Sequence, residues 1–168
     1  TFFFDGGKEI EYPDMKKIII PSPKVATYDL KPEMSVYEVT DNFLKEVENY
    51  DVTVMNLANG DMVGHTGNYE AAKQAVEHMD KCLKKIYEKV EELDGTLIVT
   101  ADHGNCDIMW DKEKKPVTSH TTSPVFFIVT RNNIELNNGK LADIAPTMLD
   151  LINLPIPKEM TGVSLIKK

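Results

Sequence analysis

Apolar residues recur every three or four positions along two stretches of the chain, and this spacing places them on one face of a helix. The first stretch follows Ser35 and Glu38, which have the spacing of a helix capping box. The second covers residues 69–93 and stops before Gly95, a residue typical of helix ends. Their apolar positions are Val36, Val39, Phe43, Leu44 and Val47, and then Ala72, Ala75, Val76, Met79, Leu83, Ile86, Val90 and Leu93. The sequence therefore predicts two amphipathic helices that pack their apolar faces into a core.

Short apolar runs bounded by turn residues predict strands. They cover residues 2–4, 18–20, 52–55, 96–100 and 125–129. A last helix is expected after Asp143, which can cap it, with Pro146 in its first turn and with Leu149 and Ile152 facing inward. Strands that alternate with helices predict an α/β fold, in which helices cover both faces of a sheet. No linker is long enough to divide the chain, so residues 1–168 are expected to belong to one domain.

Residues that can bind metal ions lie next to three of the predicted strands. Asp61 and His65 follow residues 52–55, Asp102 and His103 follow residues 96–100, and His120 precedes residues 125–129. In α/β sheets the chemistry gathers beyond the carboxyl ends of the strands, which is where Asp61 and Asp102 are expected. Carboxylates and imidazoles without paired cysteines are ligands that suit manganese, magnesium or zinc.

Each of these motifs has a simpler explanation when it is taken alone. Asp61 could cap a helix while His65 lies on the surface. His120 taken alone is as compatible with a structural role as with metal binding. However, Asp61 and His65 are four residues apart, so one helical turn or a tight loop can direct both toward one ion. Three such motifs beside separate strands together favour a metal site.

The composition argues against some classes of partner. The chain has 168 residues and a net charge of −8, which disfavours binding to nucleic acid or to an anionic membrane. No apolar stretch approaches the ~20 residues that cross a bilayer, and the first residues lack the pattern of a secretory signal. Arg131 is the sole arginine. Because anionic substrates are usually bound by arginine side chains, most of such a substrate site is expected outside this chain.

The cysteines and the fourth histidine are expected to have structural roles. Cys82 and Cys106 give no disulfide framework, which favours a reducing, cytoplasmic setting. Cys82 falls within a predicted helix and is expected to pack there. Cys106 is expected to be a spectator thiol beside the site, since no second cysteine lies at zinc-like spacing. His78 lies on the flank of the long helix and is expected to be solvated or to cap a neighbouring group.

Several strings of residues around these motifs closely resemble the signatures of one enzyme family. They are residues 56–67 (NLANGDMVGHTG), 100–105 (TADHGN), 120–125 (HTTSPV) and 141–147 (LADIAPT). Residues 21–29 (PSPKVATYD), 32–35 (PEMS) and 159–166 (EMTGVSLI) resemble the same family. On these strings the chain is similar to the cofactor-independent phosphoglycerate mutases, which belong to the alkaline-phosphatase superfamily. The resemblance covers the whole chain but only the C-terminal part of that family's longer protein.

The resemblance implies an alkaline-phosphatase-like α/β fold and an isomerase of glycolysis that interconverts 3-phosphoglycerate and 2-phosphoglycerate. The family forms a phosphoserine intermediate between two divalent ions, usually manganese. Motif by motif, Asp61, His65 and His120 are implied to bind the first ion, and Asp102 and His103 the second.

The resemblance also implies what lies outside this chain. The nucleophilic serine and the inserted domain with the substrate-binding arginines have no counterpart in residues 1–168, so we expect this chain to be the C-terminal part of the metal-binding domain and to be inactive alone. In the full-length form we expect a cytoplasmic monomer whose substrate is a small phosphorylated three-carbon acid.

Two alternatives stay open. A phosphopentomutase, or another phosphotransferase of the superfamily, shares the metal dependence. The third phosphopentomutase motif, however, resembles Asp-His-Thr-Arg-Glu, where this chain has HTTSP at residues 120–124. An alternative of a different class is a non-catalytic domain that binds metal or another protein.

Overall fold

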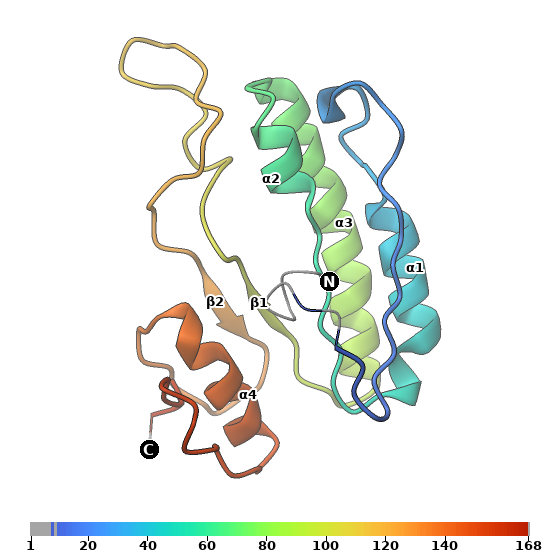
Figure 1. The fold of residues 1–168 in the computed structure, drawn as a ribbon, viewed down its shortest axis with the longest axis vertical. Coiled ribbons are helices and arrows are strands. Elements are labelled where there is room, and N and C mark those ends of the chain that lie inside the picture. The colour runs from blue at the N-terminus through green and yellow to red at the C-terminus, as the bar shows by residue number, and fades with distance from the viewer. Residues whose placement is uncertain (1–7, 9, 168) are drawn as a thin grey trace. The chain divides into compact units, whose positions relative to one another are not determined.

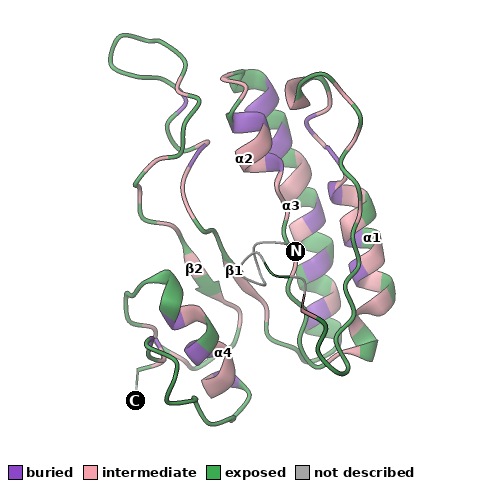
Figure 2. Cartoon of the chain, in the orientation of Figure 1, coloured by how far each residue is buried: buried purple, intermediate pink, exposed green. Residues whose placement is uncertain are grey.

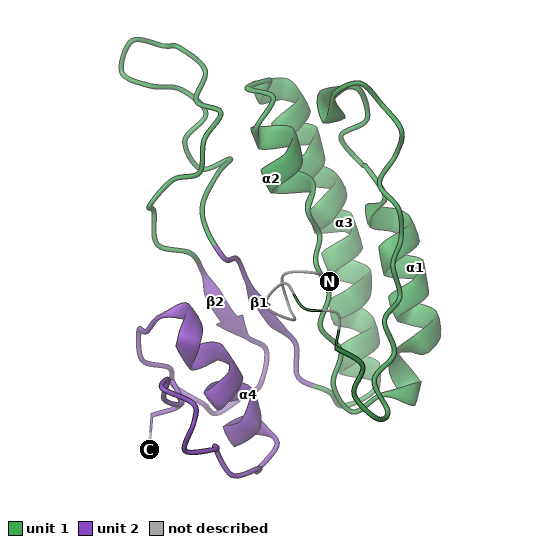
Figure 3. Ribbon diagram, viewed as in Figure 1, with its two compact units in different colours: residues 1–95, 103–125 green, residues 96–102, 126–168 purple. Residues whose placement is uncertain are grey.

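The fold comprises two compact units, each continuous in space but not in sequence. A computed structural model describes residue 8 and residues 10–167. One unit contains residues 1–95 and 103–125, and the other contains residues 96–102 and 126–168 (Figure 3). The predicted strand at residues 2–4 lies outside the described residues.

The first unit is built from helices. Helix α1 spans Val36–Glu46 and helix α3 spans Tyr69–Glu92, which confirms the two helices predicted from the apolar spacing. Helix α3 begins after Asn68, whose side chain accepts a hydrogen bond from the backbone N–H of Ala71 at 3.2 Å. The short helix α2, Asn59–Gly64, lies against α3, as does α1 (Figure 1). Over the described residues, no helix is both long enough and apolar enough to cross a membrane. The 3-10 turns of this unit are η1, Tyr28–Leu30, and η2, Val47–Asn49.

The core of the first unit fixes the position of α2. Its buried members are Met34, Val63, Ala71, Ala72, Ala75 and Met109 (Figure 2). Because the alanines of α3 have no side chain beyond Cβ, they allow α2 to approach closely, and Val63 of α2 is fully buried there. Further along α3, Cys82 is fully buried as well, in agreement with the packing role expected for it. This packing holds α2, the helix that carries Asp61.

Two local predictions for this unit are wrong. Ser35 makes no capping hydrogen bond to α1, because its hydroxyl donates instead to the backbone oxygen of Pro21 at 2.8 Å. Residues 18–20 and 52–55 form no strands, and Ile19 and Val54 are 70% and 60% exposed. A strand needs a neighbour that pairs with its backbone N–H and C=O groups. Within the described part of the chain, the sheet contains only two strands, and neither run pairs with them.

The second unit contains that small sheet and the last helix. Strand β1, Ile98–Thr100, pairs with β2, Phe127–Val129, in antiparallel register, with Ile98 opposite Val129. The 3-10 turn η3, Leu141–Asp143, leads directly into helix α4, Ile144–Leu151. These elements confirm the predicted strands near residues 96–100 and 125–129 and the last helix.

Asp143 supports this unit in a way that the sequence did not indicate. Its buried carboxylate accepts hydrogen bonds from the backbone N–H groups of Val163 and Lys140, both at 2.9 Å, and from the Lys140 ammonium at 2.9 Å. These bonds, led by that from Val163, lower the pKa of Asp143 to about 2. The side chain therefore joins two segments and does not cap α4. Pro146 is buried in the first turn as predicted, but Ile152 is 47% exposed and Leu151 is the buried residue in its place.

Candidate metal centre

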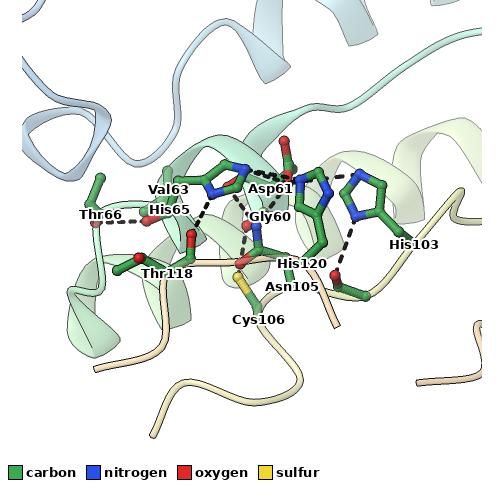
Figure 4. Close-up of polar contacts among 11 residues, drawn as sticks. Gly60, Asp61, Val63, His65, Thr66, His103, Asn105, Cys106, Thr118 and His120 are labelled. Carbon is green, nitrogen blue, oxygen red and sulfur yellow. Dashed lines mark hydrogen bonds and ion pairs between the residues drawn. The ribbon is translucent and has the colours of Figure 1, made fainter. Parts of the chain in front are cut away.

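Asp61 and His65 lie one helical turn apart at the end of α2. Asp61 is within the helix and His65 is its C-terminal cap residue, so the two side chains leave the same face. The Nε2 atom of His65 lies 3.1 Å from Oδ1 of Asp61 (Figure 4). The prediction that one helical turn directs both residues toward one point is confirmed.

His120 reaches the same point from a segment distant in sequence. Its Nε2 atom lies 3.1 Å from Oδ1 of Asp61 and 3.1 Å from Nε2 of His65. Two imidazole nitrogens and one carboxylate oxygen thus form a triangle with equal edges. The side chains of His65 and His120 are 38% and 51% exposed, so solvent and ions can reach this triangle.

A backbone carbonyl determines which nitrogen of His65 carries its proton. Nδ1 of His65 lies 2.6 Å from the carbonyl oxygen of Thr118. Because a carbonyl oxygen only accepts hydrogen bonds, Nδ1 of His65 is the donor, and in the neutral ring Nε2 has a free lone pair. That lone pair faces Oδ1 of Asp61, which is itself an acceptor. Two acceptors that face each other at 3.1 Å need a cation between them, either a proton or a metal ion.

His103 lies at the edge of the same cluster. Its Nε2 atom is 3.9 Å from Oδ1 of Asp61, and its ring stacks on that of His120 with centroids 3.7 Å apart and 19° between the planes. Its Nδ1 atom lies 3.2 Å from the carbonyl oxygen of Gly104, so Nε2 is again the atom with the free lone pair. Ligand atoms of Asp61, His103 and His120 all lie within 4.8 Å of one another.

The five candidate ligands are divided between the two units. Asp102 is exposed and belongs to the unit formed by residues 96–102 and 126–168, whereas the other four candidates belong to the first unit. The fourth histidine, His78, lies on α3, where its Nδ1 atom is 2.6 Å from the hydroxyl of Tyr37. His78 was expected to be solvated or to cap a neighbouring group, and its observed partner is instead the side chain of Tyr37 on α1.

Asn105 is a site residue that the sequence analysis missed. Its side-chain amide donates to Oδ1 of Asp61 at 2.8 Å and to the backbone oxygen of Asp61 at 3.2 Å (Figure 4). The residue is buried, and its Oδ1 atom has no hydrogen-bond partner. The signal in the sequence was its place two residues after His103, but only the fold shows that Asn105 reaches Asp61.

Cys106 has a structural contact beside the cluster. Its thiol donates to the backbone oxygen of Gly60 at 2.8 Å. Burial, and then the nearby carboxylates of Asp61 and Asp107, raise the pKa of the Cys106 thiol. A thiol with a raised pKa stays protonated at neutral pH and is a poor nucleophile and a poor metal ligand. This behaviour agrees with the spectator role expected for Cys106.

The family can be assigned from the sequence. Residues 1–156 match the family model of the Metalloenzyme superfamily, and the chain therefore belongs to that superfamily. Among its relatives are phosphoglycerate mutases. The 2,3-bisphosphoglycerate-independent phosphoglycerate mutase of Clostridium botulinum (strain ATCC 19397 / Type A) is 58% identical over 172 residues, which cover 99% of this chain and 34% of the relative. The enzyme of the same name from Francisella philomiragia subsp. philomiragia is 53% identical over 173 residues, with the same shares covered.

A solved structure supports the same relationship. The phosphoglycerate mutase of Leishmania mexicana, crystallised at low cobalt concentration, matches with a TM-score of 0.89 and 31% identity, over 99% of this chain and 34% of that chain. The match confirms the predicted alkaline-phosphatase-like α/β fold and the resemblance to cofactor-independent phosphoglycerate mutases. The chain spans about a third of the length of the relatives it matches, since each comparison covers 34% of the relative.

Proposed function

We propose that Asp61, His65 and His120 bind one divalent metal ion. The observation that carries the proposal is the convergence of two imidazole Nε2 atoms on one carboxylate oxygen, with all three edges at 3.1 Å. Histidines that bind metals typically donate their other ring N–H to a carbonyl or carboxylate, because this bond fixes the ring and raises its basicity. The bond from His65 to Thr118 has this form.

The donor set of the triangle fits a manganese ion. Two histidines and one carboxylate would hold the ion and leave positions for water or a substrate group. The donors are two nitrogens and one oxygen, a mixture that manganese accepts.

We propose that His103 and Asp102 contribute to a second ion. The Nε2 atom of His103 lies 3.9 Å from Oδ1 of Asp61, whereas those of His65 and His120 lie 3.1 Å from it. His103 is therefore the outermost of the three histidines, and we assign it to a different ion from His65 and His120. Asp102 is included because it lies in the same motif as His103, and the remaining ligands are expected from outside this chain.

We infer that the protein containing this chain interconverts 3-phosphoglycerate and 2-phosphoglycerate through a phosphoserine intermediate. When bound, two divalent ions supply positive charge that neutralises the phosphate and stabilises its transfer. The contribution of this chain is to hold the metal ligands in position. Its sole arginine is engaged elsewhere, because the Arg131 guanidinium donates to the backbone oxygen of Leu151 at 2.8 Å. We propose that residues 1–168 are the C-terminal part of the metal-binding domain of a cytoplasmic, monomeric glycolytic enzyme, and that the serine and the substrate arginines belong to the rest of it.

A titration of the 168-residue chain with Mn²⁺, followed by the electron paramagnetic resonance signal of the free ion, tests the metal site. We expect one stronger site, weakened about 100-fold or more by His65→Ala and by His120→Ala, since even supporting partners of metal ligands are worth 10–100-fold. His78→Ala is the matched control, because it removes a histidine outside the cluster. The assignment is wrong if Asp102→Ala abolishes the stronger site while His65→Ala leaves it unchanged.

A coupled assay with 3-phosphoglycerate and Mn²⁺ tests the reaction. We expect turnover by the longer protein and none by the 168-residue chain alone, because this chain supplies neither the proposed nucleophile nor the arginines. Turnover by the chain alone in the usual enzymatic range of ~1–10³ s⁻¹ would contradict this division of roles.

A further inference from the structure

The loop from His103 to Asp107 contacts both segments that carry the proposed ligands of the first ion. The backbone N–H of Thr121, the residue after His120, donates to the carbonyl oxygen of Gly104 at 2.8 Å. The amide of Asn105 reaches back to Asp61 on α2. One short loop therefore touches two segments that lie far apart in sequence, within the same compact unit.

Asn105 fixes the carboxylate of Asp61. One amide nitrogen donates both to the Oδ1 atom that faces the histidines, at 2.8 Å, and to the backbone oxygen of the same residue, at 3.2 Å. These contacts restrict both the side-chain torsions of Asp61 and its place in α2. Asn105 is buried, and it packs close to Gly64, because an added Cβ at Gly64 would lie 2.3 Å from the Oδ1 atom of Asn105. The amide thus lies directly against the helix that carries Asp61.

Asp107 fixes the segment that carries His120. The hydroxyl of Thr121 donates to Oδ1 and Oδ2 of Asp107 at 2.9 and 3.0 Å. Hydrogen bonds from the side chains of Ser123 and Thr121 lower the pKa of Asp107, so it is ionised at neutral pH and accepts both strongly. The backbone of Gly104 packs closely against this pair, because an added Cβ at Gly104 would lie 2.2 Å from the Thr121 hydroxyl and 2.6 Å from Oδ1 of Asp107.

We propose that Asn105 and Asp107 are positioning residues, which hold Asp61 and His120 at the spacing that a divalent ion requires. Neither touches the ion: Asn105 acts through Asp61, and Asp107 acts through Thr121. The loop that carries His103, a proposed ligand of the second ion, thereby also positions two proposed ligands of the first ion. This inference rests on the proposed metal site, and it adds the residues on which the affinity of that site depends.

The test is the affinity of the 168-residue chain for Mn²⁺ alone, together with its melting temperature in the presence of a chelator. We expect Asn105→Ala to weaken Mn²⁺ binding about 10- to 100-fold, the range for groups that orient metal ligands. Asp107→Ala and Thr121→Val should each weaken it about 10-fold. The double variant Asp107→Ala/Thr121→Val should bind Mn²⁺ no more weakly than either single variant, because both changes remove the same hydrogen bond.

Two further variants separate positioning from general damage. Asp107→Asn keeps an oxygen that can accept from Thr121, so its affinity should stay within about threefold of the wild type. Asp111→Ala is the matched control: it removes another exposed carboxylate that accepts two hydrogen bonds, from the N–H groups of Glu113 and Lys115, but it has no link to a ligand. We expect it to change the melting temperature and not the Mn²⁺ affinity.

The outcomes distinguish this inference from the proposed function. If the wild-type chain binds Mn²⁺ and Asn105→Ala and Asp107→Ala bind it equally well, the inference is overturned and the metal site stands. If Asp107→Asn binds Mn²⁺ as weakly as Asp107→Ala, the charge of Asp107 is responsible and not its hydrogen bond. If Asp111→Ala weakens Mn²⁺ binding to the same degree, the stability of the loop is responsible. Either result overturns the inference. If the wild-type chain binds no Mn²⁺, both the metal site and the inference fail.

Discussion

Two glycines in α2 should respond in opposite ways to the same substitution. Gly60 and Gly64 lie one turn apart in a helix of six residues, and neither has a positive φ. An alanine at either position should gain about 0.5–1 kcal/mol from the lower backbone entropy of the unfolded chain. The gain should be smaller at Gly64, because it is the last helical residue. What differs is the space for the added methyl group.

The atoms nearest to an added Cβ show how much space each glycine has. At Gly60 the nearest atom to an added Cβ is Sδ of Met79 at 3.9 Å, which is ordinary van der Waals contact. At Gly64 the added Cβ would meet Oδ1 and Cγ of Asn105 at 2.3 and 2.9 Å, and Sγ of Cys106 at 3.0 Å. Overpacking typically costs about 1–3 kcal/mol, and relief here requires the Asn105 amide to leave Asp61. We therefore expect Gly60→Ala to stabilise the chain by up to about 1 kcal/mol and Gly64→Ala to destabilise it by about 1–2 kcal/mol.

Urea unfolding in the presence of a chelator measures both free energies, and a Mn²⁺ titration shows whether the displaced amide matters for the ion. Gly64→Ala should bind Mn²⁺ more weakly, whereas Gly60→Ala should bind it as the wild type does. The reasoning is refuted if Gly64→Ala is as stable as Gly60→Ala and retains full Mn²⁺ affinity, because Asn105 would then not lie against α2.

Three further predictions concern the core, the second unit and the second ion. Ile86→Ala should cost about 2–5 kcal/mol in urea unfolding, because Ile86 is 1% exposed, and it should leave Mn²⁺ affinity unchanged. Asp143 has a folded pKa of about 2 against an ordinary 3.8, so it stabilises the fold above about pH 4 and this stabilisation is lost as the pH falls toward 2. The melting temperatures of wild type and Asp143→Asn should therefore converge between pH 5 and pH 2, and a constant gap would contradict the role of the carboxylate. In the longer protein, Asp102→Ala or His103→Ala should lower turnover by orders of magnitude with little change in melting temperature, and a melting temperature as low as that of Ile86→Ala would make these residues structural.

Helices α1 and α3 were predictable because their signals are local. The apolar spacing that defines α1 and α3 lies within each segment, and Gly95 marks the end of α3 in the sequence itself. The strands were less predictable, since a strand depends on a neighbour that its own residues do not specify. Residues 18–20 and 52–55 have the composition of strands, yet no described residue pairs with them.

The candidate site was partly predictable for the same reason. The four-residue spacing of Asp61 and His65 already implies a shared helical face, and the fold bears this out. The approach of His120 and His103 depends on tertiary contacts between distant segments. The sequence suggested it through the position of these residues beside predicted strands and through resemblance to known motifs. The supporting roles of Asn105 and Asp107 were not predicted, because the sequence alone does not distinguish an amide or a carboxylate that supports a ligand from one in an ordinary loop.

Pulsed electron paramagnetic resonance of Mn²⁺ bound at less than one equivalent tests the central claim most directly, because it detects nitrogen atoms bonded to the ion. With the 168-residue chain, the account predicts couplings from two imidazole nitrogens, of which one is lost in His65→Ala and the other in His120→Ala. Bound Mn²⁺ without nitrogen couplings, or couplings that both survive in these two variants, would contradict the assignment of Asp61, His65 and His120 as one metal site.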